Sequence, residues 1–160
     1  MYRIKPHHFI DMIKLYGGGR ESFTPDLAYE HSFYLVANEI MRDPNTKLWM
    51  TIRGDDVCNH CKYRDASGFC TDTVSHIEGV VSKDAYNKSL DKRIMDLLDM
   101  KEGETFTAYE MCLKLSTDRD IIKKVWVEDI STAERRQELF WLGLDRYIAK
   151  WNGGARMVYS

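Results

Sequence analysis

Three cysteines lie within thirteen residues near the middle of the chain, and they constrain its fold more than any other feature. Cys58 and Cys61 are separated by two residues, and Cys70 follows after eight more. The Cys-x2-Cys spacing lets two thiolates face one metal ion or cluster. The intervening segment is rich in turn-forming residues, so the third thiolate can return to the same centre. The segment therefore predicts a loop bound to iron–sulfur or zinc.

The bulk composition describes one globular domain that spans residues 1–160. A chain of 160 residues can bury one core but is short for two. The net charge of −2 argues against a nucleic-acid binder that depends on a strong basic field. No apolar run approaches the roughly 20 residues that span a bilayer, and the N-terminus lacks the apolar segment of a signal peptide. We therefore expect a cytoplasmic location, where reduced thiols favour metal binding over disulfides.

Apolar residues at helical spacing predict about six helices. The first begins at Pro6 and ends at the glycines 17–19, and the second begins at Thr24-Pro25-Asp26. Ser82 is a candidate N-cap, and capping boxes begin at Thr107 and Ser131. A further helical stretch covers 118–127, and Gly153-Gly154 closes the last helix.

Residues 47–53 alternate in polarity and predict a short strand. The expected fold is mainly α: a single compact domain of about six helices, one short strand or hairpin, and a metal-binding cysteine loop.

Three thiolates need a fourth partner unless the metal site is open. Structural zinc takes four ligands, whereas a [4Fe–4S] cluster held by three cysteines leaves one iron for another group. Cys112 lies on an amphipathic segment, where burial as a small apolar residue is the simpler interpretation. His60 lies within the Cys-x2-Cys bite and should point away, whereas His76 can fold back from beyond the third cysteine.

The pair His7-His8 at the start of the first helix is a second candidate source of ligands. Residues three and four apart share a helix face, so Asp11 can lie beside either ring. Asp11 can then orient an imidazole or bind metal itself. The same pattern is equally compatible with a helix N-terminus that is stabilised by an acidic residue.

The ordered series of motifs resembles a prokaryotic family known as domain of unknown function 1284. It comprises Lys5-Pro-His7-His8, Phe23-Thr-Pro-Asp-Leu, Arg42-Asp-Pro-Asn-Thr, Gly54-Asp-Asp-Val-Cys-Asn-His-Cys, Gly68-Phe-Cys70, Leu90-Asp-Lys-Arg-Ile-Met and Lys101-Glu-Gly-Glu-Thr-Phe. The resemblance covers about residues 4–115 and leaves a helical extension over about 116–152. Members are described as iron–sulfur proteins without an assigned activity.

The resemblance implies that the site includes His7, His8, Cys58, Cys61 and Cys70. This sequence differs from the family in two places that could otherwise supply metal ligands. Asp11 stands where the family has a cysteine, and the region 137–147 lacks the family's second Cys-x2-Cys. Asp11 can replace the thiolate as an oxygen ligand or lie outside the site.

Three functions remain open. The first is a small iron–sulfur protein in electron transfer or as an accessory to an enzyme, with a protein partner and space for a small molecule at an open iron. The second is a structural zinc protein of the Cys3His type that acts as an interaction module. The third is a metal-dependent enzyme that uses His7, His8 and Asp11. The sequence does not decide whether the chain is an enzyme.

Overall fold

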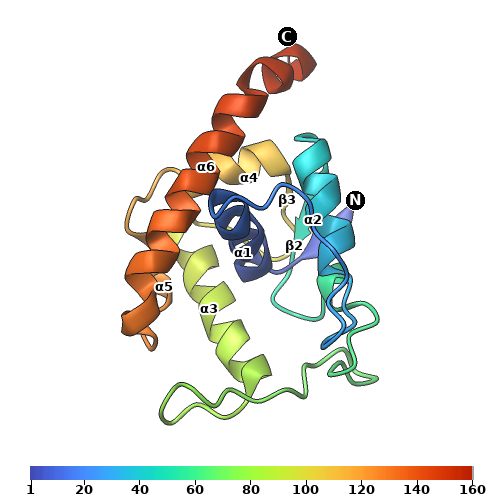
Figure 1. Ribbon diagram of the computed structural model, residues 1–160, viewed down its shortest axis with the longest axis vertical. Coiled ribbons are helices and arrows are strands. Elements are labelled where there is room, and N and C mark those ends of the chain that lie inside the picture. The colour runs from blue at the N-terminus through green and yellow to red at the C-terminus, as the bar shows by residue number, and fades with distance from the viewer. Residues whose placement is uncertain (160) are drawn as a thin grey trace.

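Six α-helices and a small sheet form the part of the chain that the computed structural model describes, residues 1–159, with side chains as far as residue 152 (Figure 1). The helices are α1 (Pro6–Gly17), α2 (Phe33–Arg42), α3 (Lys83–Leu97), α4 (Ala108–Leu115), α5 (Ile121–Val125) and α6 (Ile130–Tyr159). One 3-10 turn, η1 (Asp56–Cys58), follows the second strand. The mainly α, single-domain fold predicted from the sequence is confirmed.

The sheet has three strands, β1 (Tyr2–Ile4), β2 (Lys47–Met50) and β3 (Thr105–Thr107), in the order β1-β2-β3. The central strand β2 is parallel to β1 and antiparallel to β3. The sequence predicted β2 alone, because a strand of three residues is too short to show a polarity pattern. The parallel pairing places the carboxyl ends of β1 and β2 side by side.

Helix α1 occupies the centre of the fold, with α6 along one side and α3 below it in Figure 1. Its apolar face is fully buried at Phe9, Ile10 and Ile13. The closest packing is against α6, where Gly17 and Gly143 face the other helix's backbone without a side chain between them. The predicted C-terminal extension is therefore part of the core rather than an appendage.

Several helix boundaries differ from the prediction, including those of α5, which covers Ile121–Val125 rather than 118–127. The second helix begins at Phe33 instead of Thr24, because the Asp26 carboxylate accepts the N–H groups of Ala28 and Tyr29 and forms a local turn. The last helix begins at Ile130 and continues past the predicted stop at Gly153-Gly154 to residue 159.

Two other helix starts are confirmed. Ser82 accepts the N–H of Ala85 at 3.2 Å, and Thr107 accepts that of Glu110 at 3.1 Å, so both cap the helices that they were predicted to begin. Within the described residues, no helix combines the length and the apolar character that a bilayer-spanning segment requires.

Candidate metal centre

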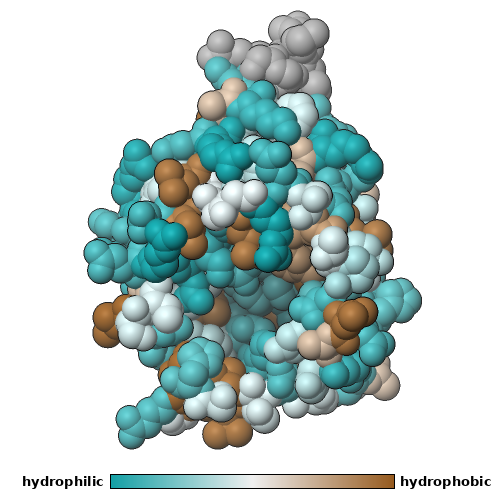
Figure 2. Space-filling view, viewed as in Figure 1, coloured by the Kyte–Doolittle hydropathy of each residue, from teal (hydrophilic) through white to brown (hydrophobic). Residues whose placement is uncertain are grey.

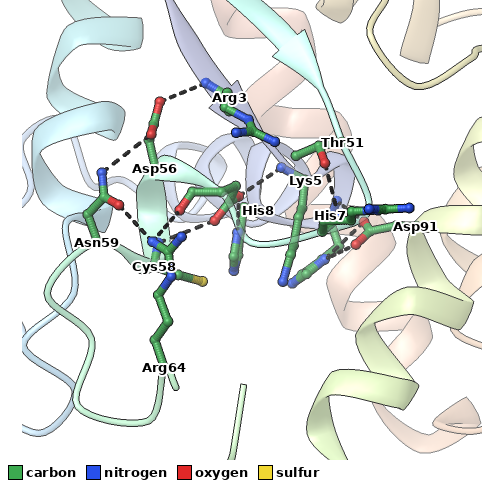
Figure 3. Close-up of polar contacts among 12 residues, drawn as sticks. Arg3, Lys5, His7, His8, Thr51, Asp56, Cys58, Asn59, Arg64 and Asp91 are labelled. Atoms are coloured by element: carbon green, nitrogen blue, oxygen red, sulfur yellow. Dashed lines mark hydrogen bonds and ion pairs between the residues drawn. The ribbon is translucent and has the colours of Figure 1, made fainter. Parts of the chain in front are cut away.

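The parallel strands β1 and β2 bring the two halves of the candidate site together. Lys5 and the first turn of α1 follow β1, whereas the segment from Thr51 to the cysteine loop follows β2. The Thr51 N–H donates to the Ile4 carbonyl at 3.1 Å, so the two chains stay adjacent as they leave the sheet. His8 and Cys58 consequently approach one another although they lie on separate segments (Figure 3).

Asp55 connects the start of α1 to the cysteine loop through hydrogen bonds. One of its oxygens accepts the Lys5 N–H at 2.8 Å and lies 2.7 Å from Nδ1 of His8, and the other accepts the Cys58 N–H at 3.2 Å. Burial would raise the pKa of Asp55, but His8 and Lys5 outweigh it and hold that pKa well below its usual value. The ionised carboxylate can only accept a hydrogen bond, so Nδ1 of His8 carries the proton and Nε2 carries the lone pair.

His7 has an equivalent partner on another helix. Its Nδ1 lies 2.9 Å from both oxygens of Asp91, which is fully buried on α3. Each of the two adjacent histidines is therefore oriented by its own carboxylate, and their ring centroids are 4.2 Å apart. Asp11, the predicted partner, has a carboxylate oxygen 3.6 Å from Nζ of Lys14, and its charge also helps to raise the pKa of His7.

The pKa values of the two histidines are shifted in opposite directions. Burial lowers the pKa of His8 despite the nearby Asp55, so its ring is neutral at pH 7. Burial also lowers the pKa of His7, but the charge and hydrogen bond of Asp91 outweigh this effect, so that pKa is raised. A protonated ring has no lone pair for a metal. His8 is thus the better ligand, and His7 the better hydrogen-bond donor.

Among the described residues, His8, Asp55 and Cys58 form the group whose potential ligand atoms all lie within 4.8 Å of one another. Burial, and secondly the Asp55 charge, raises the pKa of the Cys58 thiol to about 12. A metal that binds there must displace a proton. Asp55 was not predicted as a site residue, because nothing local in the sequence links it to His8.

Cys61 and Cys70 lie on the wall of the same cavity as Cys58, but the three thiols do not form a group within 4.8 Å. The Cys61 N–H donates to the Cys58 carbonyl at 3.1 Å, which closes the turn of the Cys-x2-Cys segment. The Cys70 N–H donates to Asp84 on α3 at 3.1 Å, which holds the end of the loop against that helix. All four cysteines of the chain are free.

The remaining cysteine and histidines occupy different places. Cys112 is fully buried in the core and is not among the cavity-lining residues, as the simpler interpretation predicted. His60 lines a separate depression beside α2, whereas His31 and His76 line the main cavity. Nε2 of His76 lies 3.8 Å from a carboxylate oxygen of Asp129, which also lines the cavity.

The cavity itself has a volume of about 640 Å³ and is visible as a hollow in Figure 2. His7, His8 and Asp11 of α1 form one wall, the cysteine loop a second, and Trp126 with Arg136 part of a third. The volume is within the range of small-molecule sites, about 300–1,000 Å³. A metal bound at the cysteine wall would therefore face a space that admits a small ligand.

The fold and cavity define a mainly α protein with cysteine, histidine and carboxylate side chains around one open hollow. A scan against family models matches residues 27–133 to "Protein of unknown function (DUF1284)", which covers more than half of the chain. The chain belongs to this family, as the sequence motifs predicted. The match includes the three loop cysteines, Asp55 and Asp91 but begins after His7, His8 and Asp11. No curated protein and no solved structure matches the chain.

Proposed function

We propose that this chain holds an iron–sulfur cluster in the cavity, with Cys58, Cys61 and Cys70 as cysteine ligands and His8 at the fourth position. The observation that carries the proposal is that all four side chains line one cavity, although they come from the start of α1 and from the cysteine loop. Cys-rich loops of this kind hold iron–sulfur clusters through thiolates, and a fourth iron accepts other donors.

The separation of the thiols supports a cluster over a single zinc ion. Four ligands around one zinc at about 2.3 Å would bring any two sulfur atoms to about 3.8 Å. The three thiols do not share a group within 4.8 Å, whereas a cluster distributes its cysteines over different irons. The loop is therefore better suited to a polynuclear centre.

His8 suits the fourth position for two reasons. Asp55 fixes its ring through Nδ1, an arrangement that orients metal-bound histidines and increases their basicity. The lowered pKa of His8, caused by burial, keeps the ring neutral at pH 7. His7 also has a carboxylate on Nδ1, but Asp91 raises its pKa and so favours the protonated ring, which cannot bind a metal. Asp11 has Lys14 as its neighbour.

The role that follows is electron transfer, or service as an accessory to a larger enzyme, in the cytoplasm. The open hollow gives solvent and small molecules access to the centre, and solvent exposure is one determinant of cluster potential. Phe69, which is 44% exposed in the cysteine loop, offers an apolar contact for a protein partner close to the cluster.

One observation favours zinc as the second candidate. His8, Asp55 and Cys58 already lie close enough to ligate a single ion. Such an ion would pin the loop to α1, and the chain would then act through its surface as an interaction module. Asp55 would have to exchange at least one of its present hydrogen bonds for the metal.

Metal content of variants tests the ligand set. Anaerobically purified protein is expected to contain iron and acid-labile sulfide, and Cys58→Ser, Cys61→Ser and Cys70→Ser should each lose most of both. Cys112→Ala removes a buried thiol away from the cavity and serves as the matched control. His8→Ala should alter the spectrum, whereas Asp11→Ala should not. Full iron occupancy in any loop-cysteine variant excludes that residue as a ligand, and stoichiometric zinc in place of iron refutes the cluster.

A further inference from the structure

Lys5 places a buried ammonium group in the wall of the cavity. The residue is only 2% exposed and immediately precedes α1. Its side chain lines the cavity and extends alongside the rings of His7 and His8 in Figure 3. Burial of a charged amine is costly unless the charge is paired or ligated, so its surroundings need a specific explanation.

Lys5 has no ion pair, unlike two other lysines that line the cavity. Nζ of Lys14 lies 3.6 Å from Asp11, and Nζ of Lys83 lies 3.1 Å from Asp72. No described residue places a carboxylate oxygen within 4.0 Å of Nζ of Lys5, and none accepts a hydrogen bond from it. The ammonium therefore has N–H donors available to a ligand in the cavity.

The nearby buried carboxylates are already engaged. Asp55 accepts the backbone N–H of Lys5 and pairs with His8, and Asp91 accepts both the backbone and the ring of His7. These two carboxylates occupy the N–H groups at the start of α1, while the helix dipole still adds positive potential there. The charge of Lys5 also favours ionised Asp55, but no described carboxylate contacts the ammonium directly, so a ligand in the cavity can supply that contact.

We propose that Lys5 binds the oxyanion of a small organic acid, a carboxylate or a phosphate, held in the cavity beside His8. A cavity of about 640 Å³ accommodates such a molecule, and a lysine ammonium binds either oxyanion as a point charge. The inference deepens the proposed function, because the acid would lie next to the proposed cluster. It uses only groups that the metal-free chain possesses, so the two proposals can fail separately.

Titration of the full-length, metal-free chain at pH 7 and constant ionic strength tests the inference. Acetate and inorganic phosphate are the probes, and acetamide is the neutral control for acetate. We expect saturable binding of at least one anion, no binding of acetamide, and at least tenfold weaker binding in Lys5→Met. The Lys14→Met variant, which changes a paired lysine on the same wall, should bind as the wild type does. Comparison of the two anions identifies which oxyanion is preferred.

The wild-type chain supplies a readout that does not depend on variant folding. The Nζ resonance of Lys5 should shift on addition of the anion that binds, with the same midpoint as the titration. An unmoved Lys5 resonance, no saturable anion binding, or equal affinity in folded Lys5→Met would each overturn the inference. Iron and sulfide content, measured separately on the same preparations, reports on the cluster alone.

Discussion

Nδ1 of His7 lies 2.9 Å from each carboxylate oxygen of Asp91, and the two residues are separated by 84 positions in the sequence. The His7 backbone N–H donates to the same carboxylate at 2.8 Å. Because Asp91 is fully buried, solvent does not screen the pair. The contact binds the first turn of α1 to α3 and fixes the His7 ring beside His8.

Asp91→Asn should lower the free energy of unfolding by about 1–3 kcal/mol, because it weakens two buried hydrogen bonds and removes the charge that faces His7. Urea unfolding of the metal-free chain measures the change. Asp96→Asn, on the exposed side of the same helix, is the matched control and should remain within about 0.5 kcal/mol of wild type. Equal losses in the two variants would contradict a structural role for the pair.

The opposite pKa shifts of the two histidines predict opposite pH dependences. The raised pKa of His7, due to Asp91, means that its contribution is fully present below about pH 6.5 and is lost as pH rises through the folded-state pKa. The lowered pKa of His8, due to burial, means that its contribution is present above about pH 6.5 and is lost as pH falls through the folded-state pKa.

Unfolding of the metal-free chain at a series of pH values measures both contributions. The stability difference between wild type and His7→Gln should shrink from pH 6 to pH 8. The corresponding difference for His8→Gln should grow over the same interval. A flat profile for either variant shows that its histidine does not titrate differently in the folded and unfolded chains.

The crossing of α1 and α6 should not tolerate a methyl group. A Cβ on Gly17 would overlap the backbone oxygen of Leu139, whereas a Cβ on the adjacent Gly18 would lie 3.4 Å from its nearest neighbour. Gly17→Ala should therefore destabilise by at least about 3 kcal/mol, since backbone cannot move aside as a side chain can. Gly18→Ala should be nearly neutral. Thermal unfolding compares them, and similar melting temperatures would contradict the close helix contact.

Cys58 should react slowly with alkylating reagents in the metal-free protein. Burial and the Asp55 charge raise its pKa to about 12, so little thiolate exists at pH 8. Its alkylation by iodoacetamide, followed by peptide mass spectrometry, should be at least about tenfold slower than that of a free cysteine peptide. Asp55→Asn removes the opposing charge and should accelerate the reaction. A rate equal to that of the free peptide would show that the thiol is exposed and unperturbed.

Local signals predicted the helices well. Pro6 starts α1, and the side chains of Ser82 and Thr107 cap α3 and α4 as their sequence positions indicate. The predicted start of α2 was wrong, because Asp26 accepts hydrogen bonds from nearby N–H groups in a turn just as it would at a helix N-terminus. Strands β1 and β3 depend on pairing with a distant strand and carry no sufficient local pattern.

The candidate site shows the same division between local and long-range information. The loop cysteines were singled out by their spacing, and the histidine pair by the resemblance to the family. Asp55 and Asp91, which orient the histidines, were not, because they lie 47 and 84 residues away from them. The helical spacing rule pointed to Asp11 instead, and that residue has Lys14 as a neighbour at the same kind of spacing.

Mössbauer spectroscopy of protein enriched in ⁵⁷Fe, together with iron and sulfide analysis, tests the cluster most directly. We expect a brown protein that absorbs near ~400 nm, contains roughly four irons and as many sulfides, and has one iron site that changes in His8→Ala. A colourless protein that contains one tightly bound zinc and no sulfide would contradict it.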